Sequence, residues 1–259
     1  MQKKKKGELM EVIAIVNRKG GVGKTATAQA LGAGLHKKGF KVLFIDLDSQ
    51  TNLSFALEAD PGKPNSLNVL TEEVKAKEAI QHTEGGDIIA GSDKLARADA
   101  VIEDNAGKYY HLKEALSTLK SIYDYVVIDT PAALDILTLN ALTAANGVII
   151  PVQADIYSLQ GIDQLQQAIA TVKKYTNKDL TIKGILITRY NARTSISKGM
   201  RENLEDMAKE LKTKVYKTPI RECTAVKEAQ FVQKDIFTYA PKSNVAADYV
   251  EFLKEFMKG

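Results

Sequence analysis

Short runs of β-branched apolar residues alternate with longer stretches of helical periodicity along most of the chain. The apolar runs predict strands over residues 11–16, 41–46, 87–90, 125–129, 147–151, 182–188 and 214–218. The periodic stretches predict helices over residues 24–38, 108–121, 136–145, 159–175, 197–211, 224–233 and 245–257. Strands that are apolar throughout are typical of a parallel sheet covered on both faces. We therefore expect an α/β fold, with a mostly parallel, twisted sheet flanked by helices on both sides.

Residues 61–106 have only weak periodicity, and we expect one domain over residues 11–259 behind a basic tail at residues 1–10. Apolar residues make up 44% of the chain and charged residues 26%, the balance of a soluble globular protein. No stretch approaches the ~18 consecutive apolar residues that a membrane span needs. A single cysteine, Cys223, is too few for a disulfide within the chain or for an iron–sulfur cluster. These features predict a cytoplasmic protein and exclude a cluster-bearing reductase.

The formal net charge of +4 is unevenly distributed. Four consecutive lysines, Lys3 to Lys6, account for the whole surplus, because the rest of the chain has 32 basic and 32 acidic residues. Residues 46–106 contain 13 acidic and 5 basic residues, whereas residues 183–234 contain 12 basic and 6 acidic ones. This asymmetry predicts one basic face on a neutral protein, suited to a polyanion such as DNA.

The clearest motif is Lys19-Gly-Gly-Val-Gly-Lys-Thr25, which directly follows a predicted strand and opens a predicted helix. Its three glycines let backbone N–H groups turn toward a phosphate, and the helix N-terminus adds positive potential. In such a loop Lys24 reaches the β- and γ-phosphates and the Thr25 hydroxyl ligates Mg²⁺. Arg18 stands where the standard P-loop has glycine, so the motif is a variant form.

Three aspartates lie at the ends of predicted strands. Asp46 and Asp48 are two residues apart, so they share a face in an extended strand, and Asp129 ends another apolar run. The carboxyl ends of strands are where α/β sheets bind ligands. The alternative is that Asp46 or Asp48 only caps the helix that follows.

Together these motifs resemble the deviant Walker A group of P-loop ATPases, the ParA/Soj/MinD class, whose signature lysine corresponds to Lys19. The resemblance covers roughly residues 11–257 and continues through Asp46-Leu-Asp-Ser-Gln-Thr-Asn52 and Asp129-Thr-Pro-Ala132. Further segments are similar to ParA-type partition ATPases in particular: Asn140-Ala-Leu-Thr-Ala-Ala-Asn146, Pro151-Val-Gln153, Tyr190-Asn-Ala-Arg-Thr194 and Tyr239-Ala-Pro-Lys-Ser-Asn244. The chain departs from the family pattern at Ala26, Ser49, Thr51, Ala132 and Asn146, and none of these removes a group that phosphoryl transfer needs.

The resemblance implies a role for each group of site residues. It gives Asp46 and Asp129 places around Mg²⁺ with Thr25, and it gives Asp48 the task of orienting the attacking water. Lys24 serves the phosphates within the subunit, whereas Lys19 crosses a dimer interface to the ATP of the partner. The nucleotide-binding set is Lys19, Gly20, Gly21, Val22, Gly23, Lys24, Thr25 and Ala26, with the base near Thr188, Arg189, Pro219, Ile220 and Arg221.

By the same resemblance the ATP-bound dimer binds DNA without sequence preference. The candidate contacts in the basic region are Arg193, Lys198, Arg201, Arg221 and Lys227. The alternative for each is a solvated charge with a local ion pair, such as Arg201 with Glu205 one helical turn away.

We therefore expect a ParA-type DNA partition ATPase that acts on the nucleoid. ATP and Mg²⁺ dimerise it, and a centromere-bound, ParB-like partner stimulates hydrolysis and release. Two alternatives remain open: a MinD-like ATPase that positions cargo on a membrane, and a small-molecule synthetase on the same scaffold. A membrane function needs a basic amphipathic C-terminal helix. The stripe present there, formed by Val245, Tyr249, Phe252, Leu253, Phe256 and Met257, instead favours packing against the core, because its opposite face has a net charge of −1.

Overall fold

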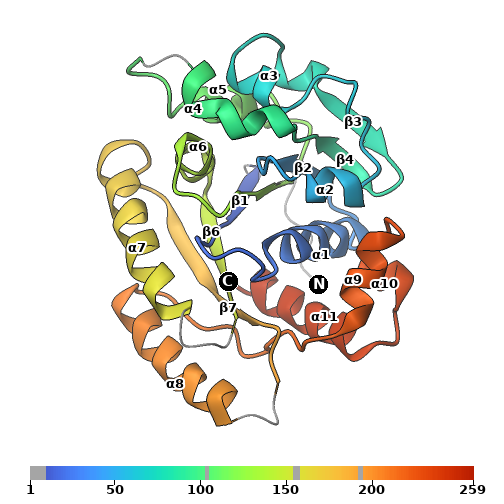
Figure 1. Cartoon of the computed structure of the whole chain (residues 1–259), viewed down its shortest axis with the longest axis vertical. Coiled ribbons are helices and arrows are strands. Elements are labelled where there is room, and N and C mark those ends of the chain that lie inside the picture. The colour runs from blue at the N-terminus through green and yellow to red at the C-terminus, as the bar shows by residue number, and fades with distance from the viewer. Residues whose placement is uncertain (1–9, 103–104, 154–157, 192–194) are drawn as a thin grey trace.

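The computed structural model describes residues 10–102, 105–153, 158–191 and 195–259. Within them, seven strands form one sheet with the order β3-β4-β2-β5-β1-β6-β7. The strands are β1 (Glu11–Ile15), β2 (Val42–Asp46), β3 (Ile80–Thr83), β4 (Gly86–Ile89), β5 (Tyr125–Asp129), β6 (Gly147–Gln153) and β7 (Thr181–Thr188). Every neighbouring pair is parallel except β3 with β4, which is antiparallel. The predicted fold class is confirmed (Figure 1).

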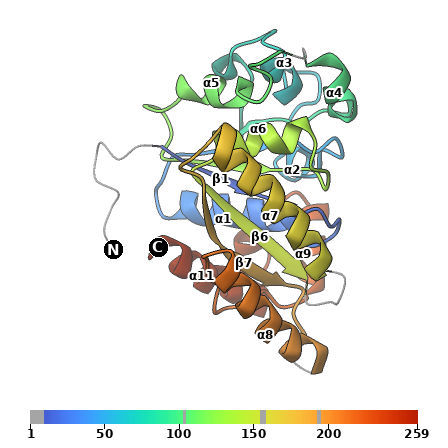
Figure 2. The same cartoon turned by 90° about the vertical axis from the view of Figure 1, so that its left-hand side faces the viewer.

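Helices cover both faces of this sheet, and the strands supply alternate residues to each (Figure 2). Ile13 and Ile15 of β1 belong to one core cluster, whereas Val12 and Ala14 belong to the other. The first cluster includes residues of α1 (Lys24–Lys37), α2 (Asn52–Ala56), α9 (Thr224–Phe231), α10 (Ile236–Tyr239) and α11 (Asn244–Met257). The second includes residues of α3 (Ser66–Leu70), α4 (Ala98–Val101), α5 (His111–Ser117), α6 (Ile136–Ala144), α7 (Ser158–Tyr175) and α8 (Ser195–Glu210).

Most predicted elements are present with ends shifted by one or two residues, but two predictions are wrong and one strand was not predicted. Residues 214–218 form no strand; Val215 makes an isolated bridge to Ile185, and the N–H groups of Lys217 and Thr218 donate to Glu255. The helix predicted over residues 108–121 covers only His111–Ser117. The predicted elements also omit β3, whose sequence Ile-Gln-His-Thr is too polar to be recognised as a strand.

The region of weak periodicity folds into short pieces. It contains α3, β3, β4 and α4, together with the short 3₁₀ helices η1 (Ala76–Glu78) and η2 (Asp93–Arg97). No element here exceeds five residues, which is why no period could be read from the sequence.

The C-terminal helix α11 packs as its apolar stripe predicts. Val245, Tyr249, Phe252, Leu253 and Phe256 are all buried in the core cluster that includes α1. Among the described residues, no helix is both long enough and apolar enough to span a membrane. The stripe that a membrane-anchoring helix would have to expose is therefore already occupied by the core.

Candidate active site

The glycine-rich loop joins β1 to α1 and leaves room for a bound group. Gly21 and Gly23 have positive φ values of +74° and +86°, which glycine adopts without strain. At Gly20 and Gly21 an added Cβ would meet no atom within 4 Å. Gly23 caps α1 without a side-chain hydrogen bond, so the first N–H groups of the helix stay available to an anion.

Two side chains hold this loop in place. The amide of Asn17 donates to the carbonyl of Pro151 at 2.6 Å, and its oxygen accepts the backbone N–H of Lys19 at 2.9 Å. From the other side, the Thr188 hydroxyl donates to the carbonyl of Val22 at 2.7 Å. The loop is therefore fixed to the ends of β6 and β7 before any ligand binds.

Lys24 lies inside the site, where burial disfavours the charged form of its ammonium group. The side chain is buried, with Nζ 3.4 Å from the carbonyl oxygen of Lys19. Burial lowers the pKa of Lys24, and the nearby carboxylates of Asp129 and Asp48 oppose that shift. A phosphate group would supply the negative charge that this buried ammonium needs.

Asp46 and Asp129 occupy equivalent positions at the ends of the paired strands β2 and β5. Asp46 accepts the N–H of Asp48 at 3.0 Å with one oxygen, and the N–H and hydroxyl of Ser54 at 2.9 and 2.7 Å with the other. Burial raises the pKa of Asp46 to about 6, although these hydrogen bonds lower it. Ser54 is in the first turn of α2, so Asp46 also accepts a backbone N–H from the start of that helix. This is the helix-capping role expected as the alternative from the sequence.

Asp129 differs from Asp46 in having no such partners. It is fully buried, and neither of its carboxylate oxygens accepts a hydrogen bond from any described residue. Burial, and then the carboxylate of Asp46, raise the pKa of Asp129 well above its usual range, and the Thr25 hydroxyl and the Lys24 ammonium oppose this shift. A buried carboxylate without partners needs a cation or water to complete it. Mg²⁺ prefers oxygen ligands, so Asp129 and Asp46, together with the Thr25 hydroxyl, fit a hydrated magnesium ion.

A cavity of about 880 Å³ lies beside this loop and is also lined by residues from the end of β7, from α9 and from α11. Its phosphate end is lined by Gly20, Gly21, Gly23, Lys24, Thr25, Ala26 and Asp48. Asp48 is tied to the N–H of Gln50 at 3.0 Å. Lys19 is half-buried and is not among the described residues that line the cavity, and Val22 contributes only its backbone to the loop.

The cavity also includes most of the residues predicted around the base, which form its base end; Thr188 lies where this end meets the loop. Thr188, Arg189, Ile220 and Arg221 line it, whereas Pro219 is not among the described residues that do. Three residues that were not predicted at this site also line this end: Cys223 and Val226 at the start of α9, and Tyr249 on α11. Phe55 and Phe231 line its mouth and were also missed.

The structure describes the side chains of three predicted DNA contacts, Arg201, Arg221 and Lys227. Arg221 and Lys227 line the nucleotide cavity, and Arg221 pairs with the buried carboxylate of Asp248 at 2.5 Å. Arg201 lies on α8 and pairs with Glu205 at 3.0 Å, which confirms the expected local ion pair. Arg193 lies outside the described residues, as does the side chain of Lys198.

Comparison with known proteins agrees with this geometry. A family model described as an AAA domain matches residues 10–182. The sporulation initiation inhibitor protein Soj of Bacillus subtilis is 37% identical over 249 residues, covering 95% of this chain and 97% of Soj. The chromosome partitioning protein ParA of Caulobacter vibrioides is 34% identical over 256 residues, covering 95% of this chain and 93% of ParA.

Solved structures show the same likeness. A structure titled cobyrinic acid a,c-diamide synthase from Mycobacterium smegmatis, with a bound ATP analogue and magnesium, is 35% identical with a TM-score of 0.83. The match covers 96% of this chain and 95% of that one. The fold and the loop thus define a P-loop nucleotide-binding protein with a deviant Walker A motif. Within that class, the chain belongs to the ParA/Soj family.

Proposed function

We propose that this protein is an ATP-driven DNA partition ATPase. In this proposal Mg²⁺-ATP binds in the cavity, a dimer forms around two nucleotides and binds DNA without sequence preference, and hydrolysis ends both interactions. The observation that carries the proposal is the phosphate end of the cavity. There a buried ammonium, Lys24, and a buried carboxylate with unsatisfied oxygens, Asp129, lie beside a loop with open N–H groups.

Each side chain at this end has a task that fits its surroundings. The loop N–H groups and Lys24 hold the phosphates, and Mg²⁺ bound near Thr25 and Asp129 would neutralise charge on the transferred group. Asp46 stabilises this arrangement through its hydrogen bonds to the backbone of Asp48 and Ser54. Asp48 orients the attacking water, because its carboxylate lines the cavity without being buried in the core.

Lys19 completes the site of the second subunit rather than its own. Lys24 already lines the phosphate end, whereas Lys19 is not among the described residues that line this cavity. A lysine at the edge of the loop can reach across a two-fold axis, in the manner of an arginine finger supplied in trans. ATP would then join two subunits, and its hydrolysis would separate them.

The relatives supply the cellular context of the proposal. One is named a chromosome partitioning protein and another a sporulation initiation inhibitor protein. We assign this chain the corresponding output: association with nucleoid DNA and stimulation by a ParB-like, centromere-bound partner. The basic segment from residue 183 to residue 234 supplies the phosphate contacts.

Removing Lys19 tests the dimer. We expect Lys19→Ala to keep nucleotide binding by the monomer within about threefold, and to lose the dimer that forms with Mg²⁺ and a slowly hydrolysed ATP analogue. Sedimentation velocity measures the dimer, and Arg18→Ala is the matched control because it removes the same charge one residue earlier. An unchanged dimer in Lys19→Ala, or an equal loss in Arg18→Ala, would contradict the role in trans.

Salt dependence tests the DNA function. We expect duplex binding only with ATP, and a log–log slope of affinity against salt of roughly −4 to −7 if each subunit makes two to four phosphate contacts. Arg193→Ala should flatten this slope by about one to two units, because the change occurs twice in a dimer. Equal binding with and without ATP would exclude the nucleotide-controlled switch.

The synthetase alternative is supported by the name of the M. smegmatis relative and by no feature of the cavity described above. The same DNA measurement separates the two functions, because ATP-dependent binding to a DNA duplex is expected of a partition ATPase and not of a small-molecule synthetase. A chain that hydrolyses ATP but never binds DNA would favour the synthetase.

A further inference from the structure

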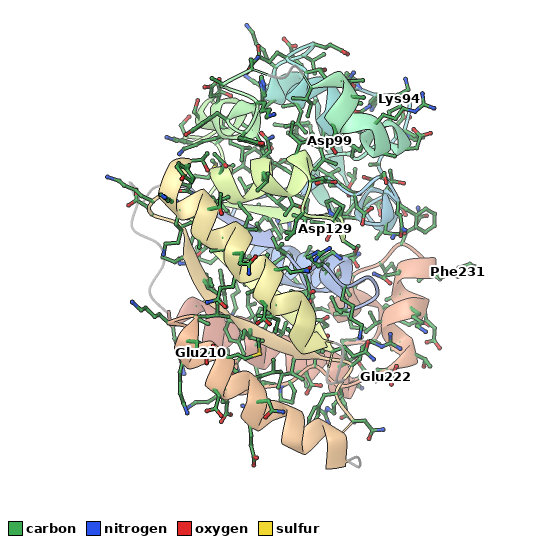
Figure 3. All side chains as sticks on the ribbon, turned by 60° about the vertical axis from the view of Figure 1, so that its left-hand side comes forward. Lys94, Asp99, Asp129, Glu210, Glu222 and Phe231 are labelled. Atoms are coloured by element: carbon green, nitrogen blue, oxygen red, sulfur yellow. The ribbon has the colours of Figure 1, made fainter. Side chains whose placement is uncertain are left out.

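Two exposed phenylalanines lie at the mouth of the nucleotide cavity. Phe55 on α2 is 55% exposed, and Phe231, the last residue of α9, is 81% exposed. Val232 follows with 42% of its surface exposed. Figure 3 shows the ring of Phe231 pointing away from the body of the protein. We call Phe55, Phe231 and Val232 the mouth patch.

The two helices that carry the mouth patch are tied together. The side-chain amide of Gln233, just beyond α9, donates to the carbonyl of Phe55 at 2.9 Å. On the other side, Gln29 of α1 donates to the carbonyl of Ala56 at 3.4 Å. The patch is therefore a fixed feature of the surface, formed by residues almost 180 positions apart in the sequence.

The charge around the patch limits what can cover it. Helix α2 contains no charged residue, and Phe231 lies between Gln230 and Val232. The exposed charges nearest to the patch along the chain are two acidic and two basic residues, so they sum to zero: Glu58, Lys227, Glu228 and Lys234. A surface that meets its own copy across a two-fold axis brings equal charges together, so a neutral patch fits such a contact. Interface cores are likewise rich in aromatic residues and poor in charge.

The size of the patch explains why it would not dimerise the protein by itself. An aromatic side chain offers about 150–250 Å² of surface, so these two exposed rings offer roughly 250–300 Å² per subunit. A stable interface needs about 800 Å² per partner. The patch therefore needs further contacts, which a nucleotide shared across the same mouth would provide.

We propose that the mouth patch is the apolar anchor through which a second copy of this chain closes over the nucleotide cavity. This inference rests on the proposed function, because the same mouth is where Lys19 of a second subunit would enter. It adds that part of the dimer's affinity comes from the rings of Phe55 and Phe231, which lie outside the glycine-rich loop. Substitution of these rings should therefore weaken the dimer without removing a group that binds the phosphates.

The first test is the dimer's dissociation constant. Sedimentation velocity is run on the full chain with Mg²⁺ and a slowly hydrolysed ATP analogue, at concentrations that saturate each variant. We expect Phe231→Ser to weaken the dimer tenfold or more, as loss of an interface anchor does. The matched control is Tyr175→Ser, an aromatic residue that is 67% exposed at the end of α7 and does not line the cavity. It should change the dissociation constant less than twofold.

The second test reports burial directly. In a Cys223→Ser background, which removes the native thiol, the thiol introduced by Phe231→Cys is treated with a maleimide. Its modification should slow at least tenfold when the ATP analogue and Mg²⁺ are added, whereas the thiol introduced by Tyr175→Cys should react at an unchanged rate. This comparison holds even if a serine at position 231 perturbs the end of α9.

The outcomes separate this inference from the proposed function. If the wild type dimerises on the analogue but Phe231→Ser dimerises equally well and the introduced thiol is not protected, the patch is overturned and the ATP-dependent dimer stands. If the thiol is protected only after an adaptor protein is added, the patch belongs to that adaptor, and the inference is also overturned. If the wild type stays monomeric with ATP, both the inference and the proposed dimer fall.

Discussion

The two ends of the nucleotide cavity are built in different ways. At the phosphate end the charged groups are buried: Lys24, Asp46 and Asp129 lie at the start of α1 and the ends of β2 and β5. At the base end Arg189 and Glu222 form a partly exposed pair at 2.7 Å, and Arg221 pairs with the buried carboxylate of Asp248. The rest of that end is formed by side chains from α9 and α11.

This difference determines how strongly a substitution at each end should change stability and nucleotide binding. A buried charge is costly unless a partner is present, so removing or adding a partner has a large effect. A solvent-exposed ion pair contributes little, because water and salt screen it. Substitutions at the phosphate end should therefore change activity and pH response strongly, whereas substitution of the exposed Arg189–Glu222 pair at the base end should change little.

The largest effect is expected for Asp48→Ala. The variant should bind Mg²⁺-ATP and dimerise like the wild type, because the loop and Lys24 are intact. Its hydrolysis rate should fall by about 10²–10⁴-fold, the usual contribution of a group that positions or deprotonates the nucleophile. Single-turnover hydrolysis measures the rate, and Asp48→Asn is the control that keeps the size and one oxygen acceptor. Hydrolysis at the wild-type rate in either variant would refute the assignment.

A smaller effect, on stability, is expected from Asp46 in the protein without nucleotide and metal. Its pKa is raised from 3.8 to about 6, so the folded state favours the neutral carboxyl. The stability that this provides is fully present below pH 4 and is lost as the pH rises through about 6. The difference amounts to about 3 kcal/mol in the free energy of unfolding, and burial of Asp129 acts in the same direction.

Comparison with Asp46→Asn isolates this contribution from those of the other carboxyl groups. Urea unfolding of both proteins between pH 4 and pH 8 should show the wild type losing stability relative to the variant as the pH rises. Parallel stability curves for the two proteins would show that Asp46 is ionised in the folded state at low pH, contrary to this expectation.

The phosphate end could be predicted from the sequence because its parts are local. Three glycines, Lys24 and Thr25 follow β1 directly, and Asp46 and Asp129 end two strands whose apolar runs are unmistakable. The observed strand order then brings β2 and β5 side by side, which the sequence pattern does not state. Motif and fold therefore support the same site.

The mouth and base end could not be predicted in the same way. Tyr249 was correctly placed in the apolar stripe of α11, but that it also lines the cavity depends on how α11 packs against α1. Phe55 and Phe231 have no motif and meet only through the tertiary structure. The strand predicted over residues 214–218 failed for a related reason, since a distant side chain, Glu255, takes two of its N–H groups.

The smallest effect is expected for Glu222→Gln at the base end. Arg189 donates to Glu222 from two nitrogens, at 3.1 and 2.7 Å, yet the side chains are 39% and 55% exposed. Such a pair contributes about 0.2–1 kcal/mol at low salt and less as salt screens it. We therefore expect nucleotide affinity to change less than threefold, and the loss of unfolding free energy to stay below about 1 kcal/mol. Isothermal titration and urea unfolding at 50 mM and 500 mM salt measure both quantities. A loss of affinity above tenfold that persists at high salt would show that Glu222 contacts the nucleotide itself, and that the base end depends on charge as the phosphate end does.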